Sequence, residues 1–129
     1  MVSANSPRRP SAISSQQVVF FTRGDNLANL NNAVLYVTRN EPTNRLKVVI
    51  VVADPSEVPK RLKKDLEFLD EAYPAIDIEL VVWRGTFGPD LIDELSETWN
   101  IPKNFMFIGS PAGHLMYGLA ELGGVRVII

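Results

Sequence analysis

Apolar residues along the chain fall into five short runs that are separated by longer segments of mixed polarity. Runs of this kind are typical of strands that are buried on both faces of a parallel sheet. The expected strands are VVFFTR (18–23), LKVVIVVA (46–53), IDIELVVW (76–83), NFMFIG (104–109) and VRVII (125–129).

The segments between these runs carry apolar residues at spacings of three and four, which indicates helices with one buried face. In the clearest of them, Asp54-Pro55-Ser56 offers capping oxygens for a helix start, and Pro74 marks its end. The expected buried stripes are Leu27, Leu30, Val34 and Val37; Val58, Leu62, Leu66, Leu69 and Tyr73; Leu91, Ile92, Leu95 and Trp99 in a helix that starts at Pro89; and Leu115, Leu119 and Leu122 in a short helix from Pro111.

The alternation of strands and helices predicts one doubly wound α/β domain over residues 17–129. We expect a five-stranded, mostly parallel sheet with helices on both faces, because each helix must form a right-handed crossover between parallel strands. Residues 1–16 are rich in Ser and Pro and have no apolar period, so they are predicted to form a flexible tail or linker.

Composition narrows the function classes. The chain has 129 residues and a formal net charge of −2, which argues against a dedicated nucleic-acid binder. It has no cysteine, which excludes a disulfide framework, a zinc-thiolate site and a cysteine nucleophile. The apolar runs are far shorter than the ~20 residues of a membrane-spanning helix. The sequence therefore predicts a globular domain without a membrane span.

Candidate catalytic chemistry is sparse. The chain has a single histidine, His114, and no Ser/His/Asp or metal-ligand spacing surrounds it. The carboxylates of the third helix, such as Asp93 and Glu97, share a helix face at a spacing that is typical of solvent exposure. We therefore expect no catalytic residue, no metal and no cofactor.

A ligand, if the domain binds one, is expected at the carboxyl ends of the strands. The candidate residues there are Arg23, Asp54, Gly109, Ser110 and Gly113. The segment FMFIGSPAG has the strand–turn–helix order of a phosphate cradle, but its proline removes an N–H donor. The glycine spacing also matches neither the dinucleotide motif nor the P-loop, so nucleotide binding stays an open and weaker interpretation.

The basic residues Lys60, Arg61, Lys63 and Lys64 cluster at the start of the second expected helix. Such a cluster contacts anionic membrane surfaces in some proteins. It is also typical of the solvated face of an amphipathic helix, which is the interpretation that we favour here.

Three segments suggest a family: NLNNAVLYVTRNEPTNRLKVVIVV (29–52), LDEAYPAIDIELVVWRGTFGPDLIDELSETWNIPKNFMFIGSP (69–111) and ELGGVRVII (121–129). They resemble the C-terminal domain of amino-acid permeases of the amino acid–polyamine–organocation superfamily. The resemblance implies a fold similar to universal stress proteins and flavodoxin, a place on the cytoplasmic side of a membrane, and a transmembrane permease domain in the same polypeptide. Related cation–chloride cotransporters carry comparable domains that pair and regulate transport.

Universal stress proteins that bind ATP use an aspartate after the first strand and a glycine motif after the fourth. This chain has Arg23 at the first place, and its glycines at 109, 113 and 118 depart from the motif.

Two hypotheses follow. The first is a non-enzymatic regulatory or assembly domain of a membrane amino-acid transporter that forms a homodimer. Its predicted self-association residues are Val125, Val127, Ile128 and Ile129, because an apolar strand at a sheet edge can pair with a second copy. The alternative is a sensor that binds a nucleotide or another small ligand at the strand ends.

Overall fold

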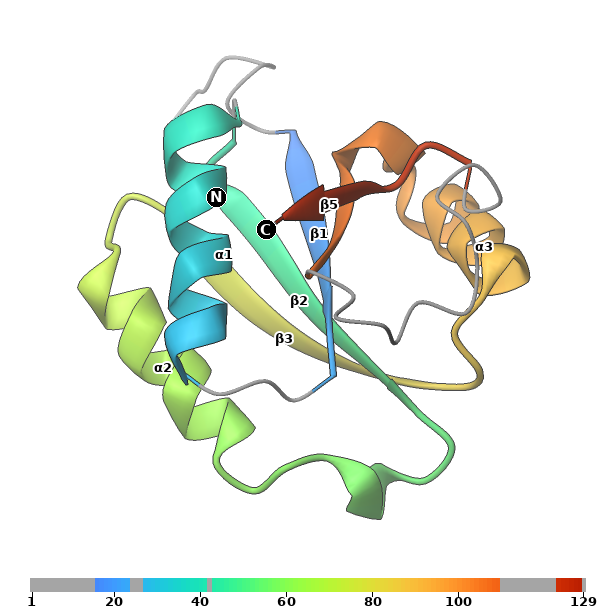
Figure 1. Cartoon of the computed structure of the whole chain (residues 1–129), viewed down its shortest axis with the longest axis horizontal. Coiled ribbons are helices and arrows are strands. Elements are labelled where there is room, and N and C mark those ends of the chain that lie inside the picture. The colour runs from blue at the N-terminus through green and yellow to red at the C-terminus, as the bar shows by residue number, and fades with distance from the viewer. Residues whose placement is uncertain (1–15, 24–26, 42, 110–122, 129) are drawn as a thin grey trace, which may run out of the picture.

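The computed structural model describes residues 16–23, 27–41, 43–109 and 123–128 (Figure 1). Its strands are β1 (Gln17–Thr22), β2 (Arg45–Val52), β3 (Asp77–Arg84), β4 (Met106–Gly109) and β5 (Arg126–Ile128). The described helices are α1 (Leu27–Asn40), α2 (Leu62–Ala72) and α3 (Pro89–Trp99), with short 3-10 turns η1 (Pro55–Glu57) and η2 (Lys103–Phe105).

The strands form one parallel sheet in the order β3-β2-β1-β4-β5. Helices α1 and α2 pack on one face of the sheet, and α3 packs on the other. The predicted α/β class, the parallel sheet and the coverage of both faces are therefore confirmed. The direction of strand addition reverses between β1 and β4, which makes their shared carboxyl end the switch point of the fold.

The central strand β1 is buried on both faces. Val18 and Phe20 pack against the α1/α2 layer, whereas Val19 and Phe21 pack against the α3 layer. All four side chains are at most 6% exposed. This double burial explains why β1 is a continuous apolar run rather than an alternating one.

The second expected helix begins later than its sequence pattern predicted. Asp54 caps the short turn η1, and Val58 then adopts an extended conformation with φ −71° and ψ 123°. Val58 precedes Pro59, and the proline ring disfavours a helical conformation in the residue before it. The helix therefore starts only at Leu62.

The fifth expected strand is much shorter than predicted. Four strands, β1–β4, form the body of the sheet, whereas β5 has three residues beside β4. Val125 lies outside the strand and is a buried core residue, 3% exposed. The predicted helix over 111–122, most of the tail over 1–16, and Ile129 lie outside the described residues.

Candidate functional site

The switch point lies at the carboxyl ends of β1 and β4, which are neighbours with Phe21 opposite Ile108. Arg23 follows β1 and is exposed, and Gly109 ends β4. The fold thus brings together these two predicted site residues, which are far apart in the sequence. The other two candidates of the fourth loop, Ser110 and Gly113, lie outside the described residues.

Asp54, the remaining candidate, is used locally. Its carboxylate oxygen Oδ1 accepts a hydrogen bond from the backbone N–H of Ser56 at 2.9 Å and so caps η1. The backbone N–H of Ser56, together with the Ser56 hydroxyl, holds the pKa of Asp54 below its usual value. Nearby, Glu57 Oε1 accepts from the N–H of Ala53 at 3.1 Å. These contacts make Asp54 a capping residue of the loop after β2.

The lowered pKa leads to a prediction for the folded chain. We expect Asp54 to titrate below 3.8. Because its folded pKa is depressed, its contribution to stability is present above the unfolded pKa and is lost as the pH falls through the folded pKa. NMR titration of the carboxyl carbon measures this value. Ser56→Ala removes the hydroxyl but keeps the N–H, so it should restore only part of the shift. Titration of Asp54 at or above 3.8 would contradict the cap.

An aromatic pair lies near the switch point, on the face of the sheet that α3 covers. The ring of Phe87, in the loop before α3, meets the ring of Phe21 edge to face with centroids 5.3 Å apart. Phe87 is half-buried. This residue was not among the sequence candidates; an aromatic residue between glycines in a loop after a strand was the available signal. The pair places an apolar contact on the α3 side of the sheet near the carboxyl end of β1.

Arg23 supplies an exposed cation at this end of the sheet. Among the residues that the structure describes, no group of three His, Cys, Asp or Glu side chains could hold a metal ion. His114, the chain's single histidine, lies outside those residues. No helix in the described part of the chain is long and apolar enough to cross a bilayer.

A second polar region lies at the amino ends of β1–β3. Gln17, Arg45, Lys47, Asp77 and Glu79 line a shallow hollow of about 150 Å³ together with Leu46. Across the strands Arg45 lies opposite Asp77, and Lys47 lies opposite Glu79 with an ion pair of 2.9 Å. The lining residues carry two cations and two carboxylates, so the hollow has no excess of either charge.

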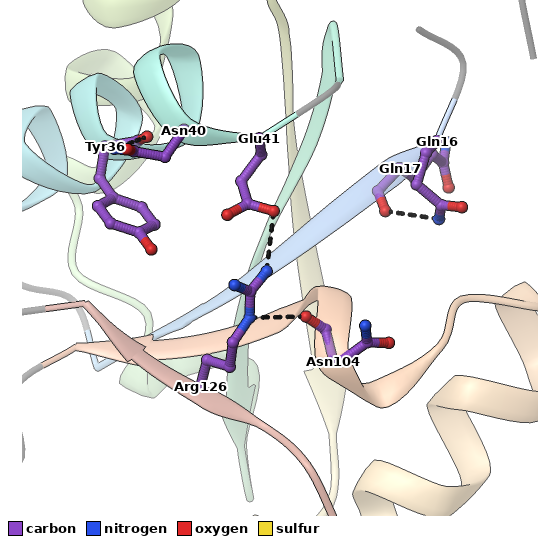
Figure 2. Close-up of polar contacts among 7 residues, drawn as sticks. All are labelled: Gln16, Gln17, Tyr36, Asn40, Glu41, Asn104 and Arg126. Carbon is purple, nitrogen blue, oxygen red and sulfur yellow. Dashed lines mark hydrogen bonds and ion pairs between the residues drawn. The ribbon is translucent and has the colours of Figure 1, made fainter. Parts of the chain in front are cut away.

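The most elaborate polar contact joins β5 to the end of α1 (Figure 2). Arg126 donates from Nη2 to Glu41 Oε1 and from Nε to the carbonyl oxygen of Asn104, both at 2.8 Å. The Glu41 side chain is only 5% exposed. The guanidinium of Arg126 also lies 4.4 Å from the centroid of the Phe107 ring. This cluster fixes the short strand β5 beside β4, and no sequence motif predicted it.

No family model, no curated protein sequence and no solved structure matches this chain.

Proposed function

We propose that this chain is a non-enzymatic regulatory or assembly domain of a membrane amino-acid transporter, on the cytoplasmic side of the membrane, which pairs with a second copy of itself. One observation supports the pairing of two copies. The sheet ends in β3 and β5, and within the described residues neither has a strand on its outer side. Exposed sheet edges present backbone donors and acceptors that pair readily with another chain.

The proposal makes the transporter the partner in the same polypeptide. We expect the upstream reading frame to encode roughly twelve apolar spans of membrane length. In vesicles that contain the whole protein, deletion of residues 17–129 should alter the rate of amino-acid uptake and leave transport itself in place. Absence of such spans, or an uptake rate that deletion leaves unchanged, would rule the proposal out.

A second candidate function, a small-ligand sensor, is favoured by the position of Arg23 and Gly109 on neighbouring strand ends. A cation at the end of a strand next to a switch point suits an anionic ligand such as a nucleotide. A thermal-shift screen with ATP, ADP, AMP and cyclic dinucleotides tests it. A ligand at a hundred times its Kd should add about 2.7 kcal/mol to the free energy of unfolding. No shift with any of these at about millimolar concentration counts against the sensor.

A further inference from the structure

The hydrogen bonds between β3 and β2 show which backbone groups of β3 point away from the sheet. The N–H of Asp77 bonds to the carbonyl of Asn44 at 2.8 Å, and the N–H of Gly85 bonds to the carbonyl of Val52 at 2.9 Å. The odd-numbered residues of β3 therefore direct their backbone groups toward β2. Because the direction alternates along a strand, the even-numbered residues direct theirs outward.

The start of this edge is blocked by α2 at Ile78. Asp70 accepts a hydrogen bond from the outward N–H of Ile78 at 3.0 Å. A carboxylate that occupies an edge N–H prevents another strand from pairing there, which is one of the ways in which proteins protect sheet edges.

The rest of the edge has no such protection in the described part of the chain. The outward backbone groups belong to Leu80, Val82 and Arg84, and no described strand lies beside them. Val82 is 43% exposed, one of the few large apolar side chains that is. The segment contains no proline or lysine, the residues that usually guard an edge. An edge left open at three of its four outward residues, with an exposed valine at the middle of the three, indicates a pairing surface.

We propose that the segment 80–84 of β3 pairs with the same segment of a second copy, antiparallel, about a two-fold axis at Val82. The three outward residues are placed symmetrically about Val82. In this register Val82 faces the partner's Val82, and Leu80 faces the partner's Arg84. A register shifted by one outward residue toward the start of the strand would need the N–H of Ile78, which Asp70 occupies. Asp70 thus selects the register as well as guarding the edge.

Packing suits a second copy as the occupant. Across the axis Arg84 faces the partner's Leu80, while its Nε donates to the carbonyl oxygen of Ala53 in its own chain at 3.2 Å. On the α3 face, Val81 faces the partner's Trp83. Trp83 already packs edge to face on Trp99 with centroids 5.8 Å apart, so the pairing extends an existing apolar cluster. No acidic residue faces another acidic residue across the axis.

The inference rests on the proposed function and assigns the pairing to the edge strand β3. The sequence pattern predicted the pairing at the other edge, in the strand over 125–129. Only three residue pairs hold β5 to β4, whereas β3 is paired with β2 over eight. A longer and more firmly held strand is the better template for an intermolecular ladder.

The test is sedimentation of the whole chain from about 10 µM to about 1 mM, with substitutions on both edges. Val82→Lys places two lysines together on the axis and should raise the dimer dissociation constant about tenfold or more. Val82→Pro removes an outward N–H without touching the β2 ladder and should weaken pairing similarly. Val82→Thr keeps shape and backbone and should pair as the parent does. Asp70→Ala frees the N–H of Ile78 and should strengthen association or cause aggregation.

Val127→Lys on β5 is the matched control, and circular dichroism checks that each variant is folded. Association that Val127→Lys weakens and the Val82 substitutions do not would overturn the β3 assignment and leave the proposed function standing. A chain that is monomeric at every concentration would overturn the inference together with the self-association part of that function. The uptake experiment would then decide the regulatory part on its own.

Discussion

Phe107→Ala is expected to lower the free energy of unfolding by about 3–5 kcal/mol, the largest single loss that we predict for this domain. Phe107 is fully buried in β4. Its ring meets Tyr36 edge to face with centroids 5.8 Å apart and is covered by the Arg126 guanidinium. Truncation therefore removes a large buried apolar surface and leaves a cavity between α1 and the sheet.

Urea unfolding followed by circular dichroism measures this loss. Domains of this size are stable by about 5–15 kcal/mol, so the variant should unfold at a much lower urea concentration. Phe68→Ala is the matched control: Phe68 lies on α2 and is 59% exposed, so its truncation should change stability by no more than about 0.5 kcal/mol. Equal losses in the two variants would mean that Phe107 is not the core residue described here.

Arg126→Met should lower the free energy of unfolding by about 2–3 kcal/mol. The substitution keeps much of the apolar stem, but it leaves the nearly buried carboxylate of Glu41 without its cation. It also deprives the carbonyl of Asn104 of the Arg126 donor. The loss stays below that of a fully buried ion pair because the Arg126 side chain is 42% exposed and screened by water.

A double-mutant cycle isolates the ion pair. Glu41→Gln removes the buried charge, so adding it to Arg126→Met should recover about 1–2 kcal/mol relative to the sum of the single losses. The control is Arg61→Met, whose exposed pair with Asp65 spans 3.6 Å on α2 and should cost about 0.5 kcal/mol or less. Additive losses in the Glu41/Arg126 cycle would show that the two side chains contribute independently.

The sequence predicted the elements well where local chemistry is strong. The run that became β2 matched to within one residue at each end, because a strand buried on both faces leaves a continuous apolar signal. The start of α2 was misplaced because the capping oxygens of Asp54 serve a 3-10 turn, and Pro59 delays the helix. The cap was recognised correctly, but a side-chain cap alone does not specify how long the turn after it will be.

The positions of the candidate site residues followed from the sequence, but their contacts did not. Arg23 and Gly109 could be placed at strand ends from the sequence, because the carboxyl ends of parallel strands share one edge. Asp54 lies at a strand end as well, yet its carboxylate is bound to the backbone of its own loop. Phe87 was missed because its contact with Phe21 joins residues from different crossovers.

By itself, the sequence determined the type and order of the elements, because apolar spacing records which faces each segment must bury. Only the tertiary structure decided which strands are neighbours and which edges remain open, since strand order depends on where each crossover returns. It also decided the pairing of Glu41 with Arg126, which are 85 residues apart. Neither residue carries a local signal for the other, because their contact exists only once β5 lies beside β4 under the end of α1.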